Sequence, residues 1–176
     1  MIDSLKSWGT KPQYSGLGFI FLHEPKKDIR WNFYCPDLTP VEVKDYHTHR
    51  IKFESQIIKG ALINEVCKWK PQHDSEYHLI ETNCVLPHFR NNVIHDGVAI
   101  QNYGQYYLPA GAWYISESDT FHRVRCPEQT ITKLKIFGKD TQNNLTIRNK
   151  NKAFRCPLKD FVKPEKELWE VLRTFF

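Results

Sequence analysis

The fold is decided by the segment Asp45-Tyr46-His47-Thr48-His49-Arg50-Ile51-Lys52-Phe53-Glu54, which is followed six residues later by Gly60. On an extended strand, side chains two residues apart project from the same face, so His47 and His49 point the same way. Neutral imidazoles bind Zn, Cu, Fe and Ni, and the Glu54 carboxylate is a further oxygen donor nearby. The segment therefore predicts a strand that can hold a metal ion.

A third histidine, His122, lies far downstream in Asp119-Thr120-Phe121-His122-Arg123-Val124, which also predicts the start of a strand. Val41 and Val43 precede the histidine pair and alternate with polar residues, as a half-buried strand does. Residue types alone favour neither a shared metal site nor three separate structural histidines. Both interpretations stay open at this point.

The spacing of His47, His49 and Glu54, followed by Gly60, resembles the first motif of the metal-binding cupins, which are small β-barrel proteins. Their second motif is matched by Gly104, Leu108-Pro109-Ala110-Gly111 and His122. The segment 114–124 looks most like the cysteine-dioxygenase branch, and it also resembles small uncharacterised bacterial and phage cupins. The resemblance covers about residues 30–140.

The resemblance implies a mainly β fold, the cupin-type double-stranded β-helix or jelly-roll barrel, over about residues 17–140 of a single domain, 1–176. The tail follows a different pattern. Leu168, Leu172 and Phe175 recur at helical spacing behind Pro164, which predicts an amphipathic helix over about 163–175. This helix packs either on the barrel or on a neighbouring subunit, so a homodimer is one assembly that we consider.

The resemblance also implies a role for each candidate site residue. His47, His49 and His122 would hold a divalent metal, with open positions for substrate and O2. Fe(II) is the metal that the resemblance favours, and Ni, Mn or Zn would suit the same ligands. If Glu54 also binds, the site becomes the germin-like type with three histidines and one glutamate.

Three further residues are candidates for contacts with the substrate. We expect Tyr114 to act as a donor, and Arg123 and Lys135 to bind an anionic group. An arginine directly after a buried strand residue usually faces the other way, which is the structural alternative for Arg123.

Glu54 fits the cupin motif only from one side. Counting forward from His49 puts Glu54 at the ligand position, whereas counting back from Gly60 puts Phe53 there. A one-residue slip on a strand turns a side chain to the opposite face. An inward Glu54 therefore requires a bulge or bend between Arg50 and Phe53.

The second motif also departs from common patterns. In the usual cupin form the third histidine position falls on Tyr114, so His122 is the ligand only in the dioxygenase-like alignment. Thiol dioxygenases carry a Ser-x-His-x-Tyr set on the next strand, and the matching positions here are Lys133, Lys135 and Phe137. Oxidation of a thiol by the usual mechanism is therefore not implied.

The net charge of +5 is spread over scattered Lys and Arg residues, which permits an anionic ligand without requiring nucleic acid. The five cysteines form no Cys-x-x-Cys pair, so neither a disulfide scaffold nor a zinc knuckle is expected. The N-terminus lacks the apolar core of a signal peptide and no run is long enough to span a membrane, so we expect a cytoplasmic protein.

These observations favour a metal-dependent cupin, and in particular a non-haem iron oxygenase of the dioxygenase-like type that acts on a small, anionic molecule. Two alternatives remain open. One is a non-catalytic cupin that binds a small molecule, and the other is a metal-dependent isomerase or epimerase. Nothing in the sequence names the substrate.

Overall fold

The structure is a computed structural model that describes residues 2–38, 45–85, 88–137, 143–152 and 162–176. The strand expected through Val41 and Val43 lies outside these residues. Neither helix within the described ranges has the length and apolar character needed to span a membrane.

The first sheet is antiparallel and has six strands in the spatial order β1-β2-β3-β12-β5-β10. The strands are β1 (Gln13–Tyr14), β2 (Phe19–His23), β3 (Ile29–Tyr34), β5 (Lys52–Lys59), β10 (Trp113–Ser116) and β12 (Thr130–Phe137). Because β12 lies between β3 and β5, strands that are distant in the sequence become neighbours. Such an arrangement is typical of jelly rolls.

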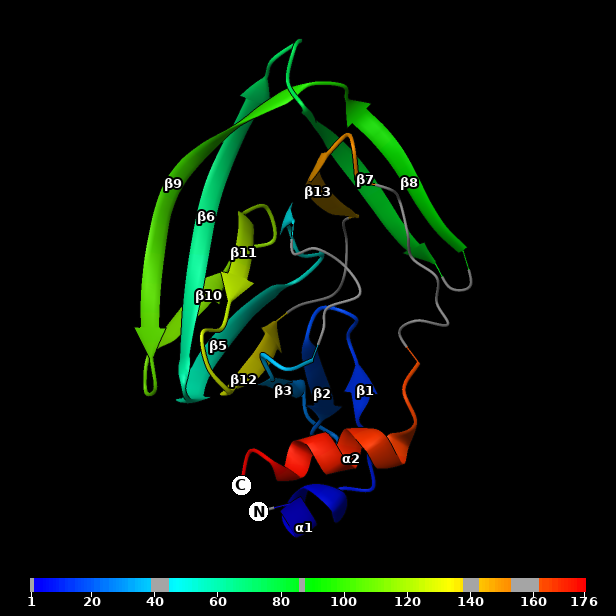
Figure 1. The fold of residues 1–176 in the computed structure, drawn as a ribbon, viewed down its shortest axis with the longest axis vertical. Coiled ribbons are helices and arrows are strands. Elements are labelled where there is room, and N and C mark those ends of the chain that lie inside the picture. The colour runs from blue at the N-terminus through cyan, green and yellow to red at the C-terminus, as the bar shows by residue number, and fades with distance from the viewer. Residues whose placement is uncertain (1, 39–44, 86–87, 138–142, 153–161) are drawn as a thin grey trace.

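The second sheet is antiparallel and has seven strands in the order β8-β7-β13-β4-β11-β6-β9. The strands are β4 (Tyr46–His47), β6 (Ala61–Pro71), β7 (Tyr77–Val85), β8 (His88–His95), β9 (Val98–Pro109), β11 (Phe121–Arg125) and β13 (Asn144–Asn149). Figure 1 shows that β6 and β9 form one arm of this sheet, and β7 and β8 the other. The predicted fold class, a mainly β jelly roll with a C-terminal helix, is confirmed.

Two helices, α1 (Ile2–Lys6) and α2 (Glu165–Arg173), cover the outer face of the first sheet (Figure 1). The C-terminal helix predicted over about 163–175 is therefore present, and it packs on its own barrel. The ring centroids of Phe33 and Phe175 lie 5.5 Å apart in an edge-to-face contact. The fully buried members of this core are Ile20, Leu22, Phe33, Leu168, Leu172 and Phe175.

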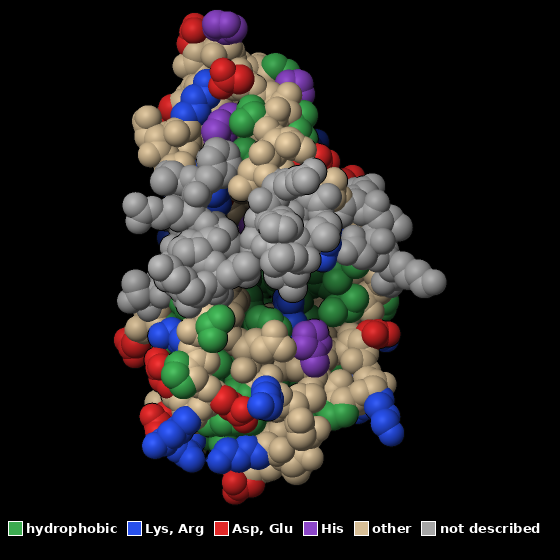
Figure 2. Space-filling model, turned by 90° about the vertical axis from the view of Figure 1, so that its right-hand side faces the viewer, with side chains coloured by type: hydrophobic (Ala, Val, Ile, Leu, Met, Phe, Trp, Pro, Cys, Tyr) green, Lys and Arg blue, Asp and Glu red, His purple; other side chains and the backbone are tan. Residues whose placement is uncertain are grey.

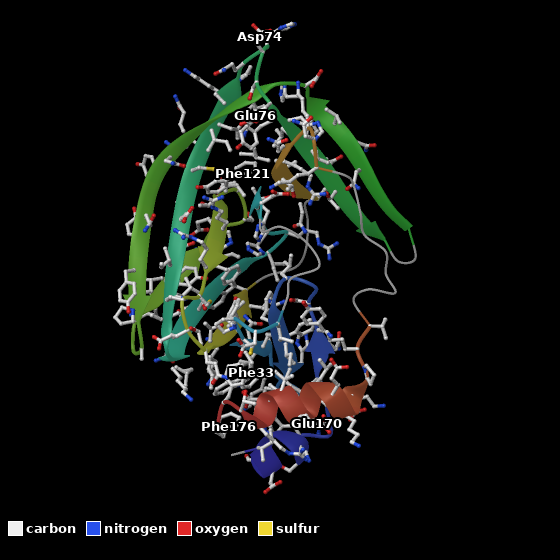
Figure 3. All side chains as sticks on the ribbon, viewed as in Figure 1. Phe33, Asp74, Glu76, Phe121, Glu170 and Phe176 are labelled. Atoms are coloured by element: carbon white, nitrogen blue, oxygen red, sulfur yellow. The ribbon has the colours of Figure 1, made fainter. Side chains whose placement is uncertain are left out.

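The helical end of the molecule combines this apolar core with a charged surface. Figure 2 shows Lys, Arg, Asp and Glu side chains at this end of one face. Figure 3 shows Phe33 beside α2, and Phe176 at the end of the chain. Phe176 remains 49% exposed although Phe175 is 1% exposed, so only one of the two terminal rings belongs to the core.

Two segments lie outside the predicted barrel of about residues 17–140 but contribute strands to its sheets. Residues 1–16 include α1 and β1. Residues 144–149 form β13 between β4 and β7. Asn and Thr residues mask the strand pattern of β13, and only Leu145 and Ile147 alternate as a strand requires. Pairing on both sides outweighs this weak local preference.

A second apolar cluster lies between the arms of the bent second sheet. Its buried members are Tyr46, Cys67, Leu79, Val98, Phe121 and Ile147. Because strand side chains alternate, Tyr46 and Phe121 point away from their neighbours His47 and His122. The strands β4 and β11 therefore bury apolar residues on one face and turn histidines toward the first sheet on the other.

Candidate metal centre

The structure brings the three predicted histidines together. His47 on β4 lies directly opposite His122 on β11, and His49 follows two residues after His47. The ring centroids are 4.9 Å apart for His47 and His49, 5.1 Å for His47 and His122, and 4.8 Å for His49 and His122. Thr48 fixes the short histidine segment, because its backbone N–H donates to Leu145 O and its Oγ1 accepts from Leu145 N–H.

The imidazole nitrogens are close enough to share one ion. The Nε2 atoms of His49 and His122 lie 2.6 Å apart, and one nitrogen from each of the three rings lies within 4.8 Å of the others. Metal–imidazole bonds are about 2.0 to 2.1 Å long for zinc, so small ring rotations would let a single ion contact all three. The three histidines therefore fit a metal.

Hydrogen bonds on the far side of two rings set the tautomers. The Nδ1 atom of His47 lies 2.9 Å from the carbonyl oxygen of Asp45, which can only accept, so Nδ1–H donates. The Nδ1 atom of His122 lies 3.0 Å from Oδ1 of the buried Asn64, and it donates in the same way. In both rings the lone pair is left on Nε2. Such partners orient the ligands of metal sites and raise their basicity.

Burial keeps the imidazoles neutral. Desolvation, together with the neighbouring His47, lowers the pKa of His122 to about 3. Desolvation also holds the pKa of His49 well below its usual value, and the charges of His47, His122 and Arg30 act in the same direction. Both rings are therefore uncharged at neutral pH, which is the form that binds metals.

The structure turns Glu54 away from the histidines. Along β5 the buried residues are Phe53, Ser55 and Ile57, while Glu54 lies on the opposite face, beside Lys135 of β12. The register of β5 with β10 and β12 runs without a shift from Phe53 to Gln56, so no bulge re-aims Glu54. Among the described residues, the group that could bind a metal contains the three histidines without Glu54.

Phe53 occupies the inward position that the cupin motif assigns to the glutamate. Its ring centroid lies 4.8 Å from that of His49 and 6.3 Å from that of His122. Counting back from Gly60 therefore gives the observed register, and the germin-like set of three histidines and one glutamate is not formed.

Of the three predicted substrate contacts, only Tyr114 lies on the histidine side of its sheet. Its ring centroid is 6.1 Å from that of Phe53, and burial raises the pKa of the Tyr114 phenol, so it stays protonated at neutral pH. Tyr114 is therefore available as a hydrogen-bond donor inside the barrel.

Arg123 and Lys135 do not face the histidines, because both follow an inward residue on their strands. Arg123 donates to the Glu65 carboxylate at 2.6 Å, and its guanidinium lies 4.5 Å from the ring centroid of Tyr46, in the second apolar cluster. Lys135 is exposed on the outer face of β12, where its amine lies 5.2 Å from the ring centroid of Phe137. The usual strand alternation explains both placements.

Arg30 is the interior cation that the sequence interpretation missed. It lies on β3, on the face opposite Trp31 and Phe33, and its guanidinium is 5.4 Å from the ring centroid of Phe21. Its Nε is buried with no hydrogen-bond partner, and no described carboxylate pairs with it. Burial lowers the pKa of Arg30, while the tyrosines Tyr34 and Tyr114 raise it.

A sequence signal for Arg30 existed in the alternation of polar and aromatic residues across 30–34. Trp31 and Phe33 pack toward the helices, which turns Arg30, Asn32 and Tyr34 toward the second sheet. The sequence does not say which face of this strand the C-terminal helix covers, so the orientation of Arg30 could not be assigned from it. The positive charge of Arg30 also lowers the pKa of His49.

The comparisons with known proteins add little to this picture. No family model and no curated protein matches the chain. Among solved structures, the crystal structure of hydroquinone 1,2-dioxygenase from Sphingomonas sp. TTNP3 with 4-hydroxybenzoate bound is similar at a TM-score of 0.37 and 10% identity, over 75% of this chain and 68% of that chain. A similarity this weak carries no functional argument. The fold and the histidine cluster together define a jelly-roll-like β protein with a candidate metal site.

Proposed function

We propose that this protein is a metal-dependent oxygenase in which His47, His49 and His122 hold Fe(II), and that it acts on a small anionic molecule. The observation that carries the proposal is the convergence of three imidazoles, two of them held neutral by burial, inside a cupin-like barrel. The described residues offer three ligands and no fourth to close the site, and such a set is typical of catalytic rather than structural sites. The motif resemblance to the cysteine-dioxygenase branch favours iron.

The bound ferrous ion would supply a centre at which O2 and the substrate meet. Around it, the chain's own residues have distinct tasks. Asn64 and the Asp45 carbonyl hold the protons on Nδ1 of His122 and His47, which presents Nε2 of each ring as the ligand atom. Phe53 covers the His49 ring and excludes water from that side.

Arg30 would bind the anionic group of the substrate. Its guanidinium is partly buried and has no carboxylate partner among the described residues, which is costly because the charge is only partly solvated. A carboxylate or a similar anion would accept hydrogen bonds from the fork of N–H groups, and charge-assisted bonds of this kind are strong. Asn32 Oδ1 and Ser116 Oγ are also buried without partners and lie on the same interior face, so they are available to a polar ligand.

A reconstitution experiment tests the metal site. The chain is loaded anaerobically with Fe(II), desalted and subjected to elemental analysis. We expect about one iron per chain, as for a single three-ligand site. A variant with His47→Ala, His49→Ala and His122→Ala should fold but bind none. Equal iron in the wild type and this variant would reject the site.

An oxygen-electrode screen tests the reaction and the role of Arg30. Small carboxylates are compared with their uncharged amides, so that each pair differs in the anionic group alone. We expect O2 uptake with at least one carboxylate and a rise in KM of about 10- to 100-fold in Arg30→Met, which corresponds to a lost charged hydrogen bond of about 1.5–3 kcal/mol. Arg123→Met is the matched control and should keep the wild-type KM. Iron-loaded protein that consumes O2 with no member of the panel would contradict the oxygenase proposal.

A further inference from the structure

The segment from Gly97 to Ser116 contains no Lys, Arg, Asp or Glu. These four residue types make up 26% of the chain, so about five would be expected in twenty residues at that frequency. The segment is nevertheless at the surface. Tyr103 is 67% exposed, Tyr107 63% and Trp113 61%. An uncharged surface rich in Tyr and Trp is typical of the centre of a protein–protein interface.

The same segment forms an edge of each sheet. β9 is the last strand of the second sheet and β10 is the last strand of the first. Figure 1 shows β9 on the outside of the molecule, away from both helices. Within the described residues β9 pairs only with β6, so the backbone N–H and C=O groups along its outer side have no strand partner.

The other sheet edges are protected in ways that β9 is not. β1 has two residues and β10 has four, which is too short for extensive pairing. β8 contains Arg90, and a charge discourages pairing. β9 has twelve residues, no charge, and a proline only at its last position. Unprotected edge strands of this length are templates for pairing with another chain.

We propose that the part of β9 from Gly104 to Leu108 pairs antiparallel with the same segment of a second copy, which forms a homodimer about a two-fold axis. The pairing of β9 with β6 shifts register between Asn102 and Gly104. The part of β9 from Gly104 onward is therefore the regular stretch that suits pairing with another strand. An antiparallel strand is self-complementary under a two-fold rotation. Two copies that each carry +5 approach with least repulsion where neither presents a charge.

This inference does not depend on the metal site. Gln105 is exposed and lies opposite Glu65 of β6, so a substitution there leaves the histidines untouched. Tyr107 projects from the same face of β9 as Gln105, because the two are separated by one residue. In a dimer centred on Tyr106, Gln105 of each copy would lie opposite Tyr107 of the other, and the partner would cover both side chains. The two side chains at position 105 would be diagonal neighbours on one face, so equal charges there would repel each other.

Sedimentation equilibrium over a wide concentration series tests the proposal, with unfolding curves to show that each variant is folded. The wild type should approach twice the monomer mass of 20.9 kDa. Gln105→Glu and Gln105→Lys should each sediment as a monomer, and an equal mixture of the two should regain the dimer mass. Ile94→Glu, an exposed position on the other edge strand β8, is the control and should dimerise like the wild type. A monomeric wild type, or dimers that neither charge weakens, would overturn it.

Discussion

Asn64 should control the metal affinity of the site although it does not contact the metal. Its Oδ1 accepts the Nδ1–H of His122 at 3.0 Å, and it is buried on β6 beside β11. Replacing it with Ala removes the acceptor, so the His122 ring can rotate or place its proton on Nε2, where the proton competes with the ion. The substitution therefore acts through one ligand of three.

The expected loss of metal affinity can be estimated from the hydrogen-bond partners of metal ligands in other proteins. Loss of a hydrogen bond that orients a ligand lowers metal affinity by about 10- to 100-fold, or about 1.4–2.7 kcal/mol. Asn64→Asp should retain most of the affinity, because a carboxylate also accepts from Nδ1–H. The matched control is Asn102→Ala. Asn102 Oδ1 accepts from the Tyr46 hydroxyl on the other side of the sheet, so its loss leaves the histidines unchanged.

Competition with a chromophoric chelator measures the affinity for Co(II) or Zn(II), and thermal unfolding of the metal-free variants measures stability separately. A structural role alone would lower the stability of Asn64→Ala and leave the affinity of its folded fraction intact. Equal metal affinities for the Ala variants at positions 64 and 102 would refute the proposed coupling between Asn64 and His122.

Three further predictions concern stability and can be measured by chemical denaturation. Both Gly60 (φ +75°) and Gly111 (φ +89°) have a positive φ, but a Cβ added at Gly60 would lie 2.4 Å from Gln129 O, whereas one added at Gly111 would meet open space. Gly60→Ala should therefore lower the free energy of unfolding by about 1–3 kcal/mol more than Gly111→Ala. Phe175→Ala should lower the free energy of unfolding by about 3–5 kcal/mol, because the Phe175 ring is fully buried. Phe176→Ala should lower it much less, because the Phe176 ring is half-exposed. Burial raises the pKa of Glu65, but two arginine ion pairs outweigh it and hold this pKa below its usual value. Wild-type stability should therefore fall as the pH drops below about 4.3, and Glu65→Gln should show a flatter profile.

The fold could be predicted because its signals are local. Alternation marks β12, glycine marks the turn at Gly60, and the spacing of Leu168 and Leu172 marks α2. β13 escaped notice because its stability comes from neighbours on both sides, and these strands are far away in the sequence. Pairing across such distances leaves little trace in the residues of the strand itself.

The site was only partly predictable for a related reason. His47 and His122 meet through a register between β4 and β11 that no local pattern encodes, so only the motif resemblance joined them. The conflict over Glu54 had a definite answer in the alternation of β5, because Phe53 and Ile57 are the apolar residues of that strand and take the inner face. Arg30 was missed because its orientation depends on which face of β3 the helices cover.

The two faces of β4 and β11 separate stability from chemistry. Tyr46 and Phe121 anchor these strands in the second apolar cluster, while His47 and His122 project from the opposite face toward Phe53. Removal of a histidine side chain therefore leaves the anchoring contacts in place, and the fold should tolerate it. Truncation of Phe121 would instead shift the strand that positions His122. Because β4 has only two paired residues, the arrangement of the histidines depends more on packing behind the sheet than on the ladder itself.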